Sequence, residues 1–284
     1  VGKMRSWGWD GTLSYRDKVG KIGFEFRGNF TVTNNKVLDY DESDTRYEYQ
    51  RMRGKSLNQA RGYIALGYFR DSAEIVNSPV HSGLVRPGDL KYKDVNGDGL
   101  INEEDKVPIG NSTVPRIQYG LAGSLNWKNW DIGVFFRGAG AVNFFYGGMG
   151  YFPFVGGLTG NILKETAKEE NRWIPAWYSG KSETENPRAR YPRLSYGENR
   201  NNFVPSTHWL ANGAYLRLKT VEVGYSFSLR VLQAWKIKRL RLSLMGDNLR
   251  VWNRVHDWDP EQASSNGAVY PLTRSWIFNL QVDF

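Results

Sequence analysis

Apolar and polar residues alternate along the last nine residues of the chain, and this alternation predicts a β-strand. The apolar positions are Trp276, Phe278, Leu280, Val282 and Phe284. The positions between them are mostly polar: Ile277, Asn279, Gln281 and Asp283. A period of two places the two sets on opposite faces of a strand. A terminal strand that ends on an aromatic residue is typical of a transmembrane β-barrel, where it also forms an outer-membrane assembly signal. The last strand of a soluble sandwich alternates in the same way.

Six further runs alternate along the chain, which gives seven predicted strands. These runs are 11–17, 22–33, 117–127, 130–137, 214–227 and 239–247. In the run 214–227 the apolar positions change parity between Leu218 and Val221, and this change predicts a β-bulge near Lys219–Thr220.

The connections between the predicted strands alternate between two length classes. The short turns are 18–21, 127–129 and 228–237, and the long loops are 34–115, 146–213 and 249–272. An up-and-down transmembrane barrel with short periplasmic turns and long extracellular loops has this alternation. The predicted fold is therefore all-β, a transmembrane antiparallel β-barrel. Complete bacterial barrels have at least eight strands and usually an even number. Residues 1–284 are therefore expected to be the C-terminal part of a larger, plugged barrel of about 22 strands.

Composition agrees with a barrel and excludes several classes of protein. No stretch approaches the ~18 consecutive apolar residues of a membrane-spanning helix. Aromatic residues make up 14% of the chain, and 31 glycines suit a barrel with aromatic girdles and bends. The absence of cysteine excludes disulfides and thiol chemistry. The net charge is +9, but the basic residues are spread along the chain, so we expect no nucleic-acid partner.

The start of the chain has neither an initiating Met nor a signal peptide. An outer-membrane protein must be exported, so we expect that a signal was removed or that the chain is a piece of a longer protein.

The stretch 94–105 has the spacing of an EF-hand-type calcium loop. The expected oxygen ligands are Asp94, Asn96, Asp98, the Leu100 carbonyl and Asp105. Gly99 supplies the sharp turn, while Asp105 stands where the pattern expects Glu, which leaves bidentate coordination open. The long flanking helices of a sensor are absent from the pattern. We therefore expect a structural Ca²⁺ that pins a long loop; the alternative is a polar turn that holds no ion.

The sequence carries no signal of catalysis. The three histidines, His81, His208 and His256, have neither metal-site nor triad spacing, and no nucleophile elbow or phosphate loop is present. We expect no enzyme.

Aromatic residues in the long loop 146–213 are the candidates for contact with a ligand or partner. They are Tyr151, Trp173, Trp177, Tyr178 and Trp209. They could stack on sugars or peptides, or pack the loop on itself or on a partner protein.

Two further expectations concern the strands. Trp127 and Trp130 flank a short turn and are predicted to lie in the periplasmic aromatic girdle. Four arginines are predicted to point into the lumen: Arg27, Arg137, Arg217 and Arg241. Their expected partners are Glu25, Asp131, Glu222 and Asp247, or residues of the plug.

Several stretches in the same order resemble one family over nearly the whole chain. They are 8–17, 88–105, 108–111, 115–120, 212–219, 246–249, 258–261 and 270–271, followed by the aromatic terminus. They resemble the C-terminal region of SusC/RagA-like TonB-dependent outer-membrane transporters. The resemblance implies a plugged barrel in the outer membrane of a Gram-negative bacterium, in contact with outer-membrane lipid. It also implies a SusD-like lipoprotein lid, energy from TonB through an N-terminal region absent here, and import of glycans or peptides.

The residues themselves leave a second hypothesis open. The chain could be a soluble or surface-attached all-β binding module with a structural calcium site.

Overall fold

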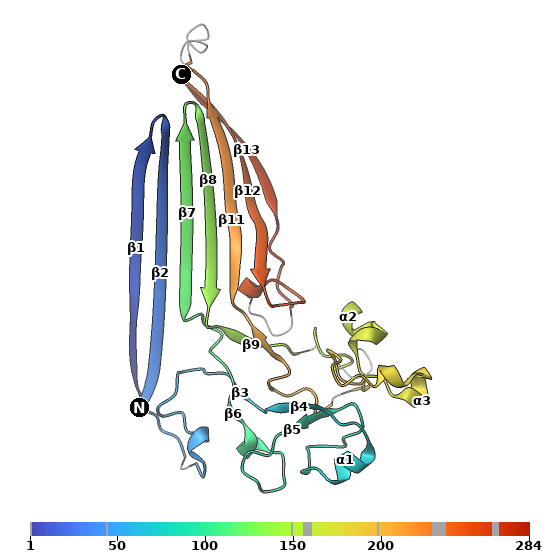
Figure 1. Cartoon of the computed structure of the whole chain (residues 1–284). Helices are drawn as coiled ribbons and strands as arrows, with labels where there is room; N and C mark the ends of the chain where they lie inside the picture. The colour runs from blue at the N-terminus through green and yellow to red at the C-terminus, as the bar shows by residue number, and fades with distance from the viewer. Residues whose placement is uncertain are drawn as a thin grey trace.

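The computed structural model of the chain describes residues 2–43, 45–148, 150–155, 161–197, 199–228, 237–262 and 267–284. Seven strands form one antiparallel sheet in the order β1-β2-β7-β8-β11-β12-β13 (Figure 1). Their bounds are Lys3–Val19, Ile22–Asp39, Ile117–Trp127, Trp130–Gly140, Tyr215–Ser226, Arg239–Asn253 and Ser275–Asp283. Each strand pairs with the one before it in this series, so the sheet is an up-and-down meander. The predicted all-β class and the seven strands are confirmed.

The register of the sheet gives it one apolar and one polar face. Paired residues in adjacent strands point to the same side of a sheet. One row across the sheet is apolar: Phe24, Leu125, Ile132, Val223, Leu244 and Phe278. The neighbouring row points to the opposite side and carries Asn126, Asp131, Gly224, Ser243 and Asn279. Polar and apolar side chains are therefore separated by the sheet itself.

A β-bulge in β11 keeps this separation intact. The register shifts between Leu218 and Thr220 on both sides of the strand, against β8 and against β12. After the shift, Leu218 opposes Phe136 and Val221 opposes Val134, so both lie on the apolar face. The bulge predicted near Lys219–Thr220 is confirmed.

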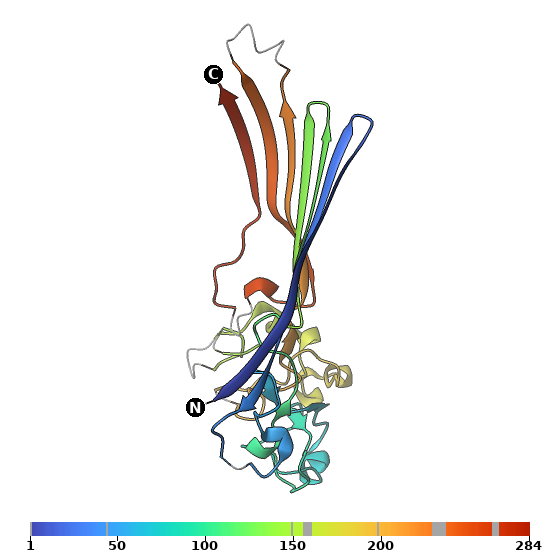
Figure 2. The same cartoon turned by 90° about the vertical axis from the view of Figure 1, so that its left-hand side faces the viewer.

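The short turns lie at one end of the sheet and the long connections at the other (Figures 1 and 2). Residues 20–21 join β1 to β2, where Gly20 has the positive φ of +60° that the turn requires. Residues 128–129 join β7 to β8. Of the predicted turn 228–237, residues 229–236 lie outside the described residues. The C-terminus lies at the turn end and the N-terminus at the loop end.

Several strands are longer than the alternation predicts. β1 spans Lys3–Val19 rather than 11–17, β2 continues to Asp39, and β12 continues to Asn253. The extra part of β2 carries Asn34, Asn35 and Lys36 and pairs with the extra part of β1. Polar residues there fall on both faces, so backbone pairing persists where the alternation has ended.

The described residues of the long connections fold into a compact structure at the loop end, which we call the loop cap (the described residues within 40–116, 141–214 and 254–274). Its strands are β3 Arg61–Gly62, β4 Ala65–Tyr68, β5 Leu90–Tyr92, β6 Val107–Pro108, β9 Asn143–Phe145 and β10 Leu210–Asn212. They pair as β3–β6, β4–β5 and β9–β10. The short α-helices are α1 Ser72–Val76, α2 Lys164–Ala167 and α3 Ala176–Ser179. The 3₁₀ turns are η1 Glu48–Gln50, η2 Glu103–Asp105, η4 Glu169–Asn171, η5 Ser182–Thr184 and η7 Pro260–Gln262.

None of the helices in the described part of the chain is long and apolar enough to cross a membrane.

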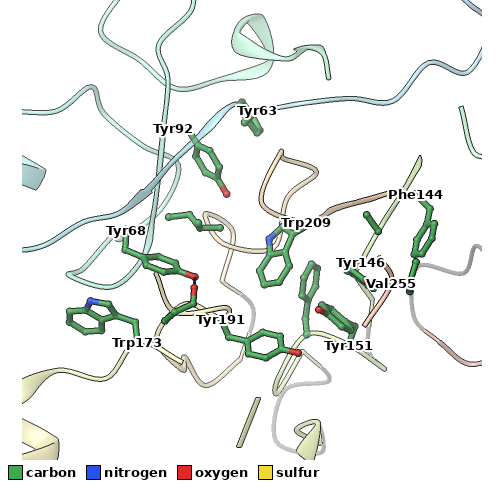
Figure 3. Close-up of a cluster of buried hydrophobic side chains, with 14 of the residues drawn as sticks. Tyr63, Tyr68, Tyr92, Phe144, Tyr146, Tyr151, Trp173, Tyr191, Trp209 and Val255 are labelled. Atoms are coloured by element: carbon green, nitrogen blue, oxygen red, sulfur yellow. Dashed lines mark hydrogen bonds between the residues drawn. The ribbon is translucent and has the colours of Figure 1, made fainter. Parts of the chain in front are cut away.

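The buried hydrophobic core lies in the loop cap and not in the sheet (Figure 3). Its aromatic members include Tyr63, Tyr68, Tyr92, Phe144, Tyr146, Tyr151, Trp173, Tyr191 and Trp209. The rings touch in stacked and edge-on pairs, such as Tyr146 with Tyr151 at 4.7 Å between centroids. Long loops of mixed composition thus hold one conformation because they share an aromatic core.

Candidate functional site

The apolar face of the sheet is exposed. Leu13 is 79% exposed and Phe278 is 68% exposed, and the same face presents Tyr15, Phe26, Phe30, Leu121, Leu125, Ile132, Leu244, Trp276 and Leu280. A continuous apolar surface across a whole sheet is far larger than a soluble monomer normally exposes. Lipid-facing strands of a barrel carry such a surface.

Aromatic residues border this face at the turn end. Trp127 opposes Trp130 across the β7–β8 turn, and the Trp130 ring contacts Tyr225 at 4.8 Å between centroids. The Lys128 ammonium lies 4.8 Å from the centre of the Trp127 ring. Indole rings beside a lysine match the composition of a membrane–water interface.

The terminal strand β13 completes the apolar face. Among the described residues it pairs only with β12, and Trp276, Phe278 and Leu280 are exposed on the apolar side. Val282 is half-buried and Phe284 is exposed after the strand ends. The assembly signal remains a prediction.

The polar face carries a three-strand ion cluster near the turn end. Arg241 of β12 lies 2.5 Å from Asp131 of β8 and 2.7 Å from Glu222 of β11, measured from Nη2 to the carboxylate oxygens. Gly224 lies beneath this contact, and a Cβ added there would stand 2.5 Å from Asp131 Oδ2. Arg241 thus pairs with two of the four carboxylates expected as partners of the arginines on this face.

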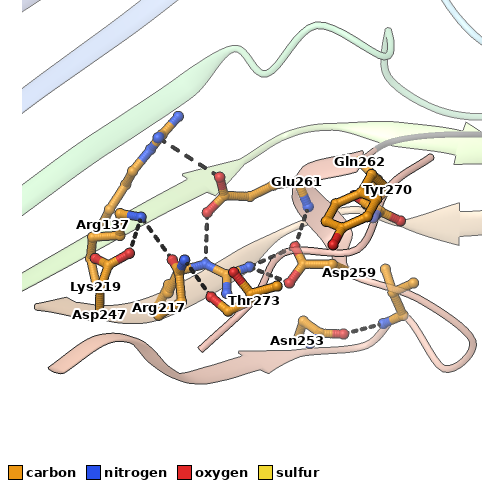
Figure 4. Close-up of polar contacts among 12 residues, drawn as sticks. Arg137, Arg217, Lys219, Asp247, Asn253, Asp259, Glu261, Gln262, Tyr270 and Thr273 are labelled. Carbon is orange, nitrogen blue, oxygen red and sulfur yellow. Dashed lines mark hydrogen bonds and ion pairs between the residues drawn. The ribbon is translucent and has the colours of Figure 1, made fainter. Parts of the chain in front are cut away.

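A second ion cluster joins the polar face to the third long loop (Figure 4). Arg137 and Arg217 oppose each other on β8 and β11. Like charges in this position repel. Glu261 lies between them, with Oε1 2.7 Å from Arg217 Nε and Oε2 3.7 Å from Arg137 Nη1. Asp259 accepts two further hydrogen bonds from Arg217 Nη2, at 2.5 and 2.6 Å.

The sheet carboxylates expected as partners are therefore wrong for Arg137 and Arg217, while the partner of Arg27 remains a prediction. Arg217 and Arg137 take their carboxylates from a distant loop, because that loop folds back over the polar face. Asp247 pairs with Lys219 at 3.2 Å, and Glu25 pairs with Arg16 at 2.6 Å.

The loop segment that holds these carboxylates is also anchored in the loop cap. We call residues 255–261 the bridging segment. Asp257 accepts a hydrogen bond from the Tyr151 hydroxyl at 3.2 Å and pairs with Arg190. The Trp258 ring contacts Tyr146 at 5.0 Å and Tyr151 at 5.4 Å between centroids. The bridging segment therefore connects the aromatic core of the cap to the polar face of the sheet.

The structure divides the five aromatic contact candidates. Tyr151, Trp173 and Trp209 are buried in the aromatic core, so the prediction of ligand contact is corrected for Tyr151 and Trp209, which pack the loop on itself. Trp173 borders a cavity. Trp177 is 85% exposed and Tyr178 is 70% exposed, and both line that same cavity.

A buried aspartate that the sequence pattern did not single out organises the cap. Asp89 is completely buried and lies 2.9 Å from Arg193 Nε. Its Oδ1 also accepts from the Asn202 amide at 2.8 Å, and its Oδ2 accepts from the Arg86 N–H at 2.8 Å. Asn202 in turn accepts from the Leu90 N–H at 2.8 Å. The only sequence signal was the position of Asp89 in the stretch 88–105.

Two histidines are structural parts of the cap. His81 Nε2 accepts a hydrogen bond from the Tyr92 N–H at 3.0 Å, so its proton lies on Nδ1, which donates to the Pro79 carbonyl at 2.7 Å. Burial lowers the pKa of His81. Burial also lowers the pKa of His208 to about 4, and its ring contacts Trp209 at 4.4 Å. Both rings are neutral near pH 7.

The predicted calcium loop closes on its own backbone. Asp94 accepts from two N–H groups of the loop and Asp98 from one. Asp105 is buried, and its two oxygens accept from the N–H groups of Val95 at 2.7 Å and Asn102 at 2.9 Å. Within the described residues, no group of three or more His, Asp or Glu side chains converges to hold a metal.

The remaining predicted ligands stay at the rim of the loop. Asn96 donates its amide to Asp98 at 2.9 Å and to Glu104 at 3.1 Å. Leu100 forms a bridge with Val80, which ties the loop to the turn before His81. The donor set is all oxygen, as Ca²⁺ prefers, and the structural calcium remains a prediction.

Known proteins match the chain over its whole length. No protein-family model matches it. Two TonB-dependent receptors of Formosa agariphila are 26% and 22% identical to it, and the chain spans about 29% of the length of each. Solved structures of the RagAB peptide transporter and of the RagAB peptide importer in the open-open state superpose with TM-scores of 0.74 and 0.72. Both are 18% identical over the whole chain, which covers 29% of theirs.

The comparisons confirm the predicted resemblance to SusC/RagA-like TonB-dependent transporters and the barrel fold. They also confirm the expected location in the outer membrane of a Gram-negative bacterium. The relatives are named as receptors and transporters rather than as enzymes.

Proposed function

We propose that this chain forms the C-terminal part of the barrel wall and of the outer loop cap of a TonB-dependent outer-membrane importer. The observation that carries the proposal is the seven-stranded meander with one exposed apolar face and one polar face. An apolar face in contact with lipid and a polar face towards the lumen account for both surfaces.

The remainder of the barrel would come from outside these residues. Among the described residues, β1 and β13 each pair with a single neighbour. Open sheet edges are not stable in the hydrocarbon of a membrane, because their N–H and C=O groups have no partners there. Further strands must therefore pair with β1 and β13, which agrees with a chain that spans 29% of its relatives.

The whole protein would import oligosaccharides or peptides with a SusD-like surface lipoprotein as its lid. A plug and a TonB-contacting segment would be supplied by its N-terminal region. The support is the likeness to TonB-dependent receptors and the fold shared with the RagAB peptide importer. We assign no catalytic role to the chain; His81 and His208 are buried parts of the cap.

The long loops would face the cell exterior and the short turns the periplasm. The loop cap is held to the polar face by Arg217, Asp259 and Glu261. It would therefore lie over the lumen, where cargo enters. The alternative of a soluble binding module would leave the apolar face of the sheet in water, at a large free-energy cost.

Cysteine labelling of cells tests this topology, with the unsubstituted protein as the background control, since residues 1–284 contain no cysteine. Lys181→Cys places a thiol in the loop cap, and Lys128→Cys places one in the β7–β8 turn; both lysines are exposed. A membrane-impermeant maleimide should label Lys181→Cys on intact cells, and Lys128→Cys only after the outer membrane is opened. Equal labelling of both, or the reverse order, would contradict the proposal.

A further inference from the structure

A cavity of about 610 Å³ lies in the loop cap between α1 and α3. Its apolar lining consists of Pro87, Trp173, Ile174, Pro175, Trp177 and Leu194. Cavities of about 300 to 1,000 Å³ with apolar walls and a few polar groups are typical of small-ligand sites. The size and lining therefore suit a ligand of a few sugar or amino-acid units.

Two residues that line the cavity, Trp173 and Arg193, are held by close contacts. Gly88 has a positive φ of +87° and packs so closely on the six-membered ring of Trp173 that no Cβ fits between them. The adjacent Asp89 forms a 2.9 Å ion pair with Arg193. Lining residues that are already held in place need little reorganisation when a ligand binds.

The acidic groups around the cavity are already occupied. Asp71 caps α1 by accepting from the Glu74 N–H at 2.8 Å, and Glu185 accepts from the Ala176 N–H at the start of α3 at 2.7 Å. Glu74 is paired with Lys91 at 2.5 Å. Each of these carboxylates is therefore held by a contact within the cap, although Asp71 and Glu185 keep their negative charge.

Arginines outnumber carboxylates in the lining of the cavity: Arg70, Arg86, Arg172 and Arg193 against Asp71 and Glu185. Arg70 is 3.7 Å from Glu74, which Lys91 already neutralises, and its side chain is 79% exposed. The Arg86 guanidinium has no partner among the described residues and also lines the cavity. Two exposed guanidinium groups beside an apolar pocket favour an anionic ligand, since arginine binds carboxylates with paired hydrogen bonds.

Trp173 is the most enclosed aromatic side chain of the lining. It is 3% exposed, whereas Trp177 is 85% and Tyr178 is 70% exposed. Its ring offers a fixed apolar surface to a ligand, and the two exposed rings offer further surface for stacking.

We propose that this cavity binds a small cargo molecule that carries a carboxylate beside an apolar or ring-shaped body. The carboxylate would be bound by Arg86 with Arg70, and the body would pack against Trp173, Trp177 and Tyr178. This assignment rests on the proposed function in one respect, which is that cargo reaches the protein from the side of the long loops. Equilibrium binding to the purified full-length complex requires no transport, so either proposal can fail while the other stands.

Calorimetric titration of the complex in detergent tests the assignment with two acidic probes and their neutral counterparts. The probes are an acetylated tetrapeptide rich in glutamate beside its glutamine amide, and trigalacturonate beside trigalactose. At least one acidic probe should bind about tenfold more tightly than its neutral counterpart. Arg86→Ala should remove this roughly tenfold preference for the acidic probe. Trp177→Ala should weaken the binding of acidic and neutral probes alike, because the apolar or ring-shaped part of the ligand loses a contact. The control Arg188→Ala removes an exposed arginine outside the cavity and should leave the affinity unchanged.

Three results would overturn the assignment. They are equal affinity for charged and neutral probes, equal loss in Arg86→Ala and Arg188→Ala, and no binding of either acidic probe. In the last case, protection of residues 70–87 from hydrogen exchange by the partner protein alone would identify that partner as the occupant instead.

Discussion

Arg217 and Glu261 form an ion pair that joins the third long loop to the polar face of the sheet. The Arg217 side chain is 3% exposed, and its Nε lies 2.7 Å from Glu261 Oε1. The two residues are 44 positions apart in the sequence. Arg217 is almost fully withdrawn from solvent. The carboxylates that this loop supplies therefore stabilise its buried positive charge.

Glu261→Gln should loosen the bridging segment while leaving the barrel intact. Loss of one partner from a buried ion pair costs about 3 to 5 kcal/mol, and less here because Asp259 remains in place. Hydrogen exchange of residues 254–262 in the purified complex should therefore accelerate, whereas exchange of β8 and β11 should not change. Glu169→Gln, at an exposed position of the cap, is the matched control. Unchanged exchange in Glu261→Gln would show that the loop is held by its aromatic contacts alone.

Gly224→Ala should destabilise the sheet through the Arg241 cluster. The new methyl group would lie 2.5 Å from Asp131 Oδ2 and displace the ion pair. A steric clash of this kind costs about 1 to 3 kcal/mol. Gly133→Ala is the control, because a Cβ at that glycine of the same face meets nothing within 4 Å. The temperature at which the folded barrel loses its gel mobility should fall for Gly224→Ala only, and equal behaviour of the two variants would contradict this account.

The loop cap should lose stability in mild acid. His208 has a native pKa of about 4 against an ordinary value of 6.5, so the unfolded chain binds more protons below pH 6.5. Stability should be constant above that pH, decrease as the pH falls, and level off below about 4. The total loss from His208 is about 3 kcal/mol. Hydrogen exchange of the cap as a function of pH measures it.

The matched variants for this pH effect are His208→Gln and His256→Gln. His208→Gln should flatten the profile, while His256→Gln, at an exposed position, should keep it. If the profile of the cap is flat in the natural protein, the neutral buried histidine is not the cause of any acid sensitivity.

The predicted calcium loop should bind Ca²⁺ with a dissociation constant of about 10⁻⁴ to 10⁻³ M, the range of extracellular structural sites. Asp94→Asn together with Asp98→Asn should abolish Ca²⁺-dependent protection of residues 94–105 from proteolysis. Glu103→Gln, outside the expected ligand set, should preserve it. Absence of Ca²⁺-dependent protection at 10 mM, about tenfold above the upper value, would favour a loop that is closed by its own N–H groups.

The sheet could be predicted from the sequence because alternation reports directly on a membrane-facing strand. The parity change at Leu218 and Val221 even located the bulge. The ends of β2 and β12 could not be predicted, since residues such as Asn34 and Lys36 show no alternation where both faces are polar. The alternation also places Arg241, Asp131 and Glu222 on the same polar face, where the structure joins them across three strands.

Contacts made by the long loops could not be predicted in the same way. The partnership of Arg217 with Asp259 and Glu261 depends on how a long loop folds back, which no local pattern encodes. Likewise, Trp177 and Trp209 are both aromatic residues of one loop, yet one is exposed and the other is buried. Only the packing of the aromatic core separates structural rings from available ones.

Lipid contact of the apolar face is tested most directly by fluorescence quenching at two adjacent positions of β7. A fluorophore is attached to Leu125→Cys or Ser124→Cys in the full-length protein, reconstituted with brominated lipids. These neighbours point to opposite faces of the sheet. Strong quenching at Leu125→Cys with little at Ser124→Cys is the predicted result. Equal quenching at both positions, or none at Leu125→Cys, would contradict a membrane-spanning sheet.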